Sequence, residues 1–568
     1  MLPSAILERI GLAGKPGPAA ECARRASLPR HLIEDLRPMA QSLEWRLSAW
    51  SWARLGVRPF TSGEVPYLVN NDGRLSRDAA ALFFINCLET EPPGDRIVVL
   101  ELGAGTGLFA RYFLDEIQLL CERESRDYYD RLRYLVTDGS PHTVQFWQEK
   151  EIFREHADHV AASACQSGEV QALNAGPVRA VFCNYVLDSL PAAVLRRRGG
   201  VWEQRCERTW ITDDAALLRQ YTALSTGEIR ECAASEAPEN LERILPLLPL
   251  LETEAEFVPV GEKGPPGVEE LSATGGAEPF TYNYGALDCL ETALRSLEPE
   301  GFILINDYDA APCGQRFGPC AAIGLNFPLM EDRLRRAGVS VREAEGDARC
   351  RVHARLLLRL DLAATRGAFE SRFSAAAQGK IREPAEQARR QAEHGLLREA
   401  LHSYRLALER NPKNWQLIGD VAGFVAEELN DPATGVELAR SAIELNPWYS
   451  PDLWNVLGDC LARLGRHAEA HECYGQAYRM HPENPRASLR LAGSWLRLGD
   501  PVRCLETIAQ GLAYDSKSML RHLLLEKQQE AIAALSVRWN REFERANRRE
   551  AGYDSGISQE DLEDGNNS

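Results

Sequence analysis

The sequence lacks the cysteine spacing that zinc sites and small disulfide-bonded domains require. None of its fourteen cysteines forms a Cys-x-x-Cys pair, and the closest two, Cys313 and Cys320, are seven positions apart. Zinc-binding and secreted disulfide modules need closer, regular spacing. We therefore expect reduced thiols that lie mainly in the core, no metal site and a cytoplasmic protein.

Excess positive charge and long apolar runs are also missing. The formal net charge is −18, whereas binding to a phosphate backbone needs clustered Lys and Arg. The most apolar later stretch, Ile244–Leu251, contains prolines and is too short to span a bilayer. Near the N-terminus, Glu8 and Glu21 count against a transit peptide, and no signal-peptide pattern is present. We expect neither nucleic acid nor membrane as a partner.

The composition is that of an ordinary globular protein. Of the 568 residues, 44% are hydrophobic and 26% are charged. A chain of this length forms two or three domains, each with its own core.

The most informative stretch is Ile97–Gly107, IVVLELGAGTG. A continuous apolar run that ends in an acid and glycines predicts a buried parallel strand, a tight turn and the start of a helix. Glycine lets the backbone turn sharply and approach a ligand closely. We expect this turn to bind S-adenosylmethionine through Glu101, Gly103, Ala104, Gly105, Thr106 and Gly107.

A dinucleotide site is the alternative for this turn, because Gly105-x-Gly107-x-x-Ala110 satisfies a relaxed Rossmann fingerprint. The register disagrees, since a strand that ends at Leu102 puts Gly103 at the first turn position and Leu108 where the third glycine belongs. Acid-x-Gly-x-Gly-x-Gly is the methyltransferase form of the turn.

Polar residues follow the next predicted strands. Asp138 ends the strand YLVTD, where it would accept hydrogen bonds from ribose hydroxyls or cap the turn DGSP. Asn184 and Asp188 follow a strand over 180–183, and Asp307 with Tyr308 follows the strand GFILIND. Ligands of a doubly wound sheet lie where its strands end. We therefore expect Asn184, Asp188 and Asp307 to be catalytic, with Asn184 also near the cofactor.

Other segments predict helices, a hairpin and an insertion. Residues 1–60 are expected to form a helical extension, with helical spacing over Leu32–Leu47. VLRRRGGVWEQRC predicts a β-hairpin around two glycines. Residues 212–280, with a helical part over Ala237–Glu256, are expected to be an insertion, which is either a substrate lid or a surface excursion.

Four motifs together give the chain a family resemblance: ELGAGTG, YLVTDGSP, NYVLDSLP with the following hairpin, and GFILINDYDA. Over roughly residues 60–360 the chain resembles the MidA-like methyltransferases, which use S-adenosylmethionine. The resemblance implies a class I methyltransferase fold and cofactor contacts that include Asp138. One member of that family methylates an arginine of a respiratory complex subunit.

The chain also departs from this family. The family usually has Glu and Phe where this sequence has Tyr185 and Val186, although Asn184, Asp188 and Pro191 match. Because a carboxylate orients a guanidinium by paired hydrogen bonds, the loss of this acid counts against an arginine acceptor. The family's aromatic N-terminal Gly-Tyr-Tyr segment has no clear copy here.

The C-terminal part repeats with a period of 35 residues, visible in Ala407, Ala442 and Ala477 and in the prolines five positions after each. The unit that begins at Trp454 matches the tetratricopeptide pattern at nearly every position. Three to four such repeats form a stable array. We expect this array to bind a protein segment, to clamp the catalytic domain or to form a dimer.

These observations predict an α/β doubly wound methyltransferase domain followed by an all-α repeat array. The expected limits are 1–60 for the extension, 61–362 for the catalytic domain, 363–384 for a linker, 385–530 for the repeats and 550–568 for a disordered acidic tail. We expect a methyltransferase that acts on a protein, with arginine as one candidate acceptor. The alternatives are an inactive assembly factor and an enzyme that methylates a small molecule.

Overall fold

The computed structural model describes residues 29–61, 65, 72–165, 176–261, 264–271, 278–310, 315–317, 319–346, 351–515 and 520–554. Contacts divide the chain into two units, Met1–Pro59 with Asp78–Ala375 and Phe60–Arg77 with Ala376–Ser568. The predicted domain limits stay predictions. The predicted acidic tail lies outside the described residues from residue 555 onward, whereas 550–554 end a helix. Among the described helices, none has the length and apolar content needed to span a bilayer.

The first unit contains a seven-stranded mixed sheet of order β13-β14-β10-β5-β2-β3-β4. Strands β4, β3, β2, β5 and β10 are parallel, and β14 runs antiparallel to both of its neighbours. The order reverses between β2 and β5, so the crevice expected to bind a ligand lies at their carboxyl ends. The strands are β2 (Ile97–Leu102), β3 (Leu132–Asp138), β4 (Val160–Ala164), β5 (Val178–Asn184), β10 (Leu297–Tyr308), β13 (Ser340–Glu343) and β14 (Val352–Leu358).

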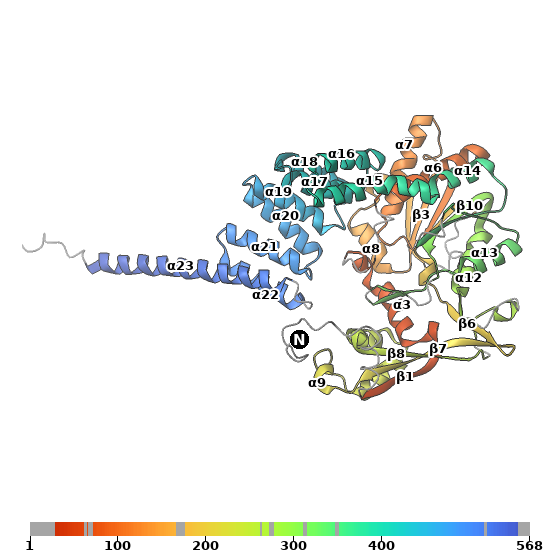
Figure 1. Ribbon diagram of the computed structural model, residues 1–568, viewed down its shortest axis with the longest axis horizontal. Coiled ribbons are helices and arrows are strands. Elements are labelled where there is room, and N and C mark those ends of the chain that lie inside the picture. Colours follow the sequence, from red (N-terminus) through yellow and green to blue (C-terminus); the bar gives the residue numbers. More distant parts are fainter. Residues whose placement is uncertain are drawn as a thin grey trace, which may run out of the picture. The chain divides into compact units, whose positions relative to one another are not determined.

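Helices cover both faces of this sheet (Figure 1). Alternate residues of the strands point to opposite faces, and Leu100, Cys183 and Ile305 join the core formed with α12 and α13. On the other face, Phe113 of α7 lies 5.2 Å from Phe182, centroid to centroid. The predicted doubly wound fold is therefore confirmed. The covering helices are α6 (Arg74–Thr90), α7 (Leu108–Glu124), α12 (Tyr284–Ser296) and α13 (Phe327–Arg336).

A second sheet has the order β1-β7-β6-β9, with β8 paired to β7. The predicted hairpin is confirmed, because β6 and β7 pair antiparallel up to Arg198 and Val201. Gly199 and Gly200 form its turn with φ of 57° and 84°, the conformation that a two-residue hairpin needs. The strands are β1 (Arg30–Pro38), β6 (Ala193–Arg198), β7 (Val201–Thr212), β8 (Leu251–Pro259) and β9 (Phe280–Tyr282).

Two helix predictions are wrong in part. The first half of Leu32–Leu47 lies in β1, which pairs with β7, and the helix α3 (Leu43–Leu55) begins only after the cap Ser42. Likewise, the end of Ala237–Glu256 lies in β8. Both strands pair with β7, a partner remote from β1 in sequence, and such pairing overrides local periodicity.

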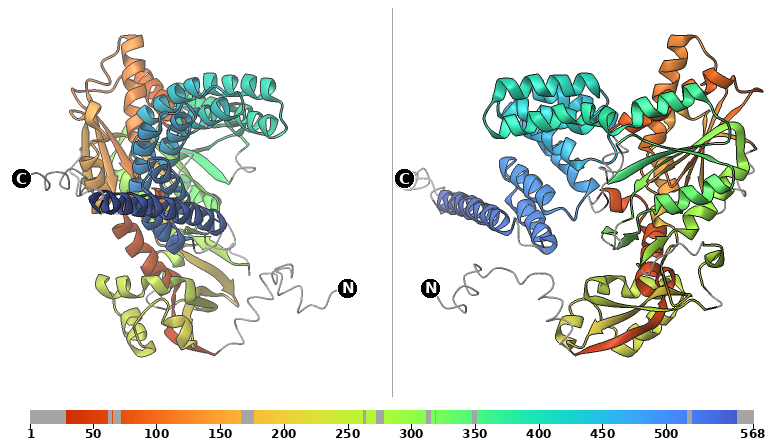
Figure 2. Two further views of the ribbon diagram at one scale, coloured as in Figure 1. Left: turned by 90° about the vertical axis from the view of Figure 1, so that its left-hand side faces the viewer. Right: turned by 45° about the vertical axis from the view of Figure 1, so that its right-hand side comes forward.

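The second unit is an array of antiparallel helix pairs, seen side by side in Figure 2. Each turn within a pair has one residue with positive φ, namely Gly395, Asn430, Gly465 and Gly499, with φ of 71°, 53°, 77° and 79°. Asparagine tolerates this conformation, so the second pair keeps the turn without glycine. The pairs are α15 (Ala375–Glu393) with α16 (Leu397–Arg410), α17 (Trp415–Glu427) with α18 (Pro432–Leu445), α19 (Pro451–Arg463) with α20 (His467–Met480), and α21 (Pro485–Arg497) with α22 (Pro501–Tyr514), followed by α23 (Arg521–Asp554).

Close packing within the third pair depends on Gly458. A methyl group added there would lie 2.6 Å from the ring of Tyr474, and the Tyr474 hydroxyl donates a hydrogen bond to Asp459 Oδ1 at 2.7 Å. We expect Gly458→Ala to lower the free energy of unfolding by about 1–3 kcal/mol through overpacking.

Gly493→Ala on α21 is the matched control, because nothing lies within 4 Å of an added methyl group there. It should raise the free energy of unfolding by about 0.5–1 kcal/mol through helix propensity. Urea unfolding of the full chain, followed by circular dichroism, measures both variants. Equal effects of the two substitutions would contradict the packing role of Gly458.

Candidate active site

The predicted glycine turn follows β2 directly. Gly103, Gly105 and Gly107 have φ of 62°, 53° and 74°, a region that side chains with a Cβ rarely adopt. The backbone amide of Ala104 donates to the Thr137 carbonyl at 2.8 Å, and that of Gly107 donates to the Ala104 carbonyl at 2.9 Å. The turn is thus closed onto β3, and α7 begins immediately after it.

Two of the glycines are also required by their neighbours. A Cβ on Gly103 would lie 2.4 Å from Val186 Cγ2, and one on Gly107 would lie 3.0 Å from Trp147 Nε1. The Trp147 indole donates to the Gly105 carbonyl at 3.0 Å. The turn is therefore held between the loop after β5 and the helix α8 (Pro141–Glu149).

Asp138 lies at the end of β3, beside this turn. Its Oδ2 accepts a hydrogen bond from the Gly105 amide and its Oδ1 accepts one from the Ser140 amide, both at 2.9 Å. Burial raises the pKa of Asp138 to about 6. The local capping role is observed, and the Thr143 side chain also hydrogen-bonds to this carboxylate. Since a carboxylate has about four acceptor positions, one remains for a ribose hydroxyl.

Glu101 lies inside the sheet, at 2% exposure. Its Oε2 accepts a hydrogen bond from the Tyr134 hydroxyl at 3.0 Å. Burial, with a smaller contribution from Asp138, raises the pKa of Glu101 to about 8. Burial therefore favours the protonated form of this acid, and its hydrogen bond with Tyr134 links β2 to β3 ahead of the turn.

The loop after β5 has an unusual backbone. Tyr185 has φ of 54°, which is uncommon for a bulky residue. Its amide donates to the Asn306 carbonyl at 2.8 Å, and Asn306 Nδ2 donates to Asn184 Oδ1 at 2.9 Å. The Nδ2 of Asn184 is buried without a hydrogen-bond partner. A buried donor of this kind is suited to a ligand.

Two buried acids lie beyond this backbone, Asp188 in the short helix η4 (Leu187–Ser189) and Asp307 in β10. Asp307 Oδ2 accepts hydrogen bonds from the amides of Leu187 and Asp188 at 3.0 and 3.3 Å, and its Oδ1 accepts one from the Tyr308 amide at 2.8 Å. Burial raises the pKa of Asp188 to about 7. Burial and the neighbouring Asp188 raise the pKa of Asp307 well above its usual value.

These contacts give the two acids different roles. Both oxygens of Asp307 accept backbone amides, so this residue positions the loop that carries Asp188. The structure therefore brings Asn184, Asp188 and Asp307 together at the carboxyl ends of β5 and β10, next to the glycine turn.

Three further residues of this region were not predicted from the sequence: Trp147, Val186 and Asn306. Asn306 immediately precedes the predicted Asp307, and its partner is the paired residue Asn184 on β5. This pairing becomes visible only once the strand register is known. Trp147 and Val186 carry no local signal, because their roles depend on contacts with glycines remote in sequence.

The chain passes from the first sheet to the second beside the candidate site, at the carboxyl end of β5. β6 follows η4, and β9 leads into α12 and back to β10. The segment from β6 to β9 therefore starts and ends near the candidate site, whereas the predicted insertion, residues 212–280, begins within this segment at the end of β7. On the other side, Ser140 Oγ donates to the Ala53 carbonyl of α3 at 2.7 Å, so the N-terminal layer contacts the turn after Asp138.

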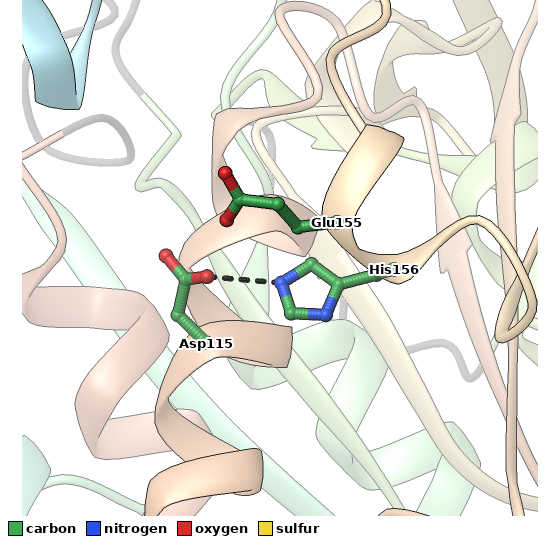
Figure 3. A group of neighbouring side chains, drawn as sticks. All are labelled: Asp115, Glu155 and His156. Atoms are coloured by element: carbon green, nitrogen blue, oxygen red, sulfur yellow. Dashed lines mark hydrogen bonds and ion pairs between the residues drawn. The ribbon is translucent and has the colours of Figure 1, made fainter.

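Figure 3 shows a separate cluster, Asp115, Glu155 and His156, whose potential ligand atoms lie within 4.8 Å of one another. His156 Nε2 lies 2.9 Å from Asp115 Oδ1, and its Nδ1 lies 2.7 Å from the Tyr129 hydroxyl. Arg111 forms ion pairs with both acids. Since the two ring nitrogens and both carboxylates have protein partners, the cluster links α7 to η2 (Arg154–His156).

The sheet order, the glycine turn and the acidic strand ends define the class of the first unit as a class I methyltransferase fold. Residues 80–319 match the model of a family described as "Putative S-adenosyl-L-methionine-dependent methyltransferase". Residues 423–470 and 461–535 match two models described as "Tetratricopeptide repeat". Residues 80–319 thus resemble this methyltransferase family, the C-terminal part resembles tetratricopeptide repeats, and the predicted cofactor is the one that the family description names.

Three solved structures are similar to portions of this chain. An uncharacterized protein from Burkholderia thailandensis is 13% identical, with 62% of this chain and 97% of that chain covered and a TM-score of 0.37. Another solved structure from this organism, described as a likely methyl transferase bound to S-adenosyl-homocysteine, is 14% identical, with 59% and 82% covered and a TM-score of 0.34. The MamA protein is 15% identical, with 30% and 96% covered and a TM-score of 0.23. None of the curated proteins matches this chain.

Substitution of Gly103 tests the turn. Because a Cβ there would lie 2.4 Å from Val186 Cγ2, we expect Gly103→Ala to weaken S-adenosyl-homocysteine binding at least about tenfold, a loss of about 1.4 kcal/mol. Isothermal titration calorimetry measures the affinity.

Gly94→Ala is the matched control, since Gly94 also has positive φ, 76°, but nothing within 4 Å of an added Cβ. It should lower stability by about 1–2 kcal/mol through backbone strain and leave the affinity unchanged. Unchanged affinity in Gly103→Ala would show that the turn is not the cofactor site.

Glu101 predicts a dependence of stability on pH. Its folded pKa of about 8 lies above its unfolded value of 4.5, so between these values the folded state binds more protons and stability falls as pH rises. Glu101→Gln keeps an acceptor for Tyr134 and removes the titration. We expect the variant to match the wild type below pH of about 4.5 and to exceed its free energy of unfolding by roughly 1–4 kcal/mol at pH of about 8. Urea unfolding across this range measures the difference, and a gap that stays constant with pH would contradict burial of the acid.

Proposed function

We propose that this protein transfers a methyl group from S-adenosylmethionine to a nitrogen of a protein substrate that the repeat array recruits. The contact between Gly103 and Val186 is the main support. It joins the glycine turn to the loop that carries Asn184 and Asp188, so cofactor and acceptor groups meet at one edge of the sheet. We also propose a cytoplasmic location, consistent with the burial of the described cysteines in the core.

The residues of the turn fit this cofactor. The positive φ of Gly103, Gly105 and Gly107 gives a tight turn at the carboxyl end of β2, and Asp138 lies beside it at the end of β3. The residues that would hold the cofactor are Glu101, Gly103, Ala104, Gly105, Thr106, Gly107, Asp138 and Asn184. The bound cofactor supplies an electrophilic methyl group on a sulfonium.

Asp188 is the proposed proton acceptor. An acceptor nitrogen must lose one proton as its bond to the methyl carbon forms and the carbon–sulfur electron pair returns to sulfur. A carboxylate with a pKa of about 7 takes up a proton near neutral pH, which is the property a general base needs. Asp307 holds the backbone of Leu187 and Asp188, and the Nδ2 of Asn184 orients the acceptor or the cofactor.

The repeat array offers a candidate site for recruitment at Asn455 in α19. This residue is 2% exposed, and neither its Nδ2 nor its Oδ1 has a hydrogen-bond partner. A side-chain amide matches the donor and acceptor of a peptide group. An unsatisfied buried amide is costly, so we propose that a peptide segment of the substrate bonds to Asn455. The alternatives for the array are a clamp on the catalytic domain and dimer formation.

A transfer assay with methyl-labelled cofactor tests these roles in the full chain, with a lysate of the source cells as substrate. We expect a labelled protein band. Asp188→Asn should abolish the label and keep S-adenosyl-homocysteine binding within about threefold, because the lost proton acceptor acts in the chemical step. Asn455→Ala should weaken the label at low substrate concentration and restore it at high concentration, since recruitment affects binding.

Asp332→Asn and Glu472→Ala are the matched controls, because both residues lie on the surface and should transfer as the wild type does. Label in a small product would favour the small-molecule methyltransferase. Cofactor binding without any transfer would favour the assembly factor. Full labelling by Asn455→Ala at every substrate concentration would contradict recruitment through this residue.

A further inference from the structure

We propose that Tyr185 and Tyr308 bind the cationic head of the methyl acceptor, an ammonium or guanidinium group, beside Asp188. This inference rests on the proposed function and names the chemistry of its substrate. It assigns a role to Tyr185, the residue that stands where the MidA-like family usually has glutamate.

The two rings lie at the carboxyl ends of neighbouring strands. Asn184 of β5 pairs in register with Asn306 of β10, and Tyr185 and Tyr308 follow these residues by one and two positions. The ring centroids are 5.4 Å apart and the ring planes are inclined by 59°. Both side chains are partly exposed. Together they form a partly exposed aromatic pair at the carboxyl ends of β5 and β10, close enough to Asp188 for that acid to act on Tyr308.

The conformation of Tyr185 is held by its surroundings. A tyrosine with φ of 54° costs roughly 1–2 kcal/mol compared with an ordinary backbone. The bond from its amide to the Asn306 carbonyl and the close approach of Val186 to Gly103 hold this backbone in place. Backbone strain that is retained at the edge of an active site indicates a functional role for the strained residue.

The charges around the rings favour a cation. Asp188 and Asp307 are buried at 5% and 0% exposure. Burial raises the pKa of Tyr308, and both acids raise it further, whereas the exposed Arg351 lowers it. Asp188 in its carboxylate form attracts a positive ligand head, and the faces of aromatic rings attract cations as well. Ring faces and Asp188 therefore act on the same charge.

In this arrangement one acid and two rings contact the cationic head. A guanidinium can stack on a ring and keep paired hydrogen bonds to Asp188. An ammonium can lie over a ring and donate to the same carboxylate. Ammonium and guanidinium groups are both cations that donate hydrogen bonds, so the site can recognise either. Binding measurements decide which of the two it prefers.

Calorimetric titrations test this subsite in the full chain saturated with S-adenosyl-homocysteine. The probes are n-butylammonium and n-butylguanidinium, with n-pentanol as the uncharged comparison. We expect at least one cation to bind about tenfold more tightly than n-pentanol, and the preferred cation then identifies the acceptor class.

Two kinds of variant distinguish the loss of an aromatic ring from a disturbance of the folded site. Tyr185→Asn removes the ring but tolerates positive φ, and Tyr308→Leu removes the other ring. Each should weaken cation binding by about five- to thirtyfold, whereas Tyr185→Phe should stay within about threefold of the wild type. S-adenosyl-homocysteine affinity, measured in parallel, reports on the fold of the site.

The outcomes distinguish this inference from the proposed function. Cations that bind no better than n-pentanol, or unchanged cation binding in both Tyr185→Asn and Tyr308→Leu, would overturn the aromatic subsite while leaving methyl transfer in place. Failure of the wild type to bind S-adenosyl-homocysteine would instead remove the proposed function itself.

Discussion

The candidate site depends on the contact between Gly103 and Val186. Because Gly103 has no Cβ, the loop after β5 can lie directly against the turn after β2. Any larger residue would push the two apart, since packed interiors have little free volume. This approach brings the cofactor turn together with Asn184 and Asp188. It also fixes the start of the loop whose backbone Asp307 then holds.

The buried acids follow from the same geometry. Glu101, Asp188 and Asp307 lie at or near the ends of central strands, where water is excluded. Burial disfavours their charged forms, so their titration moves toward neutral pH. The environments separate their roles: Glu101 bonds to Tyr134, Asp307 accepts backbone amides, and Asp188 is the acid proposed to meet the substrate. Perturbed acids that gather in this way are typical of functional sites.

The repeat array depends on close packing between neighbouring helices. Small residues such as Gly458 lie where helices touch, and a residue with positive φ recurs in each turn. Asn455 does not follow this pattern, because a buried side-chain amide without hydrogen-bond partners lowers the stability of the array. Asn455 is the buried side chain of the described array in which both the donor and the acceptor have no partner, and a bound peptide would explain it.

The sequence by itself determined the parallel core strands, the glycine turn, the hairpin and the repeat period, because each depends on residues adjacent in the chain. Gly103 and Gly199 predict the turns in which they lie, and the apolar runs predict buried strands. Helix was predicted wrongly over parts of β1 and β8, since both strands are stabilised by pairing with β7. Only the tertiary structure decided which polar residues meet. The pairing of Asn184 with Asn306, the contact of Val186 with Gly103 and the facing rings of Tyr185 and Tyr308 join segments remote in sequence. Such contacts depend on strand order and register, which local patterns do not contain.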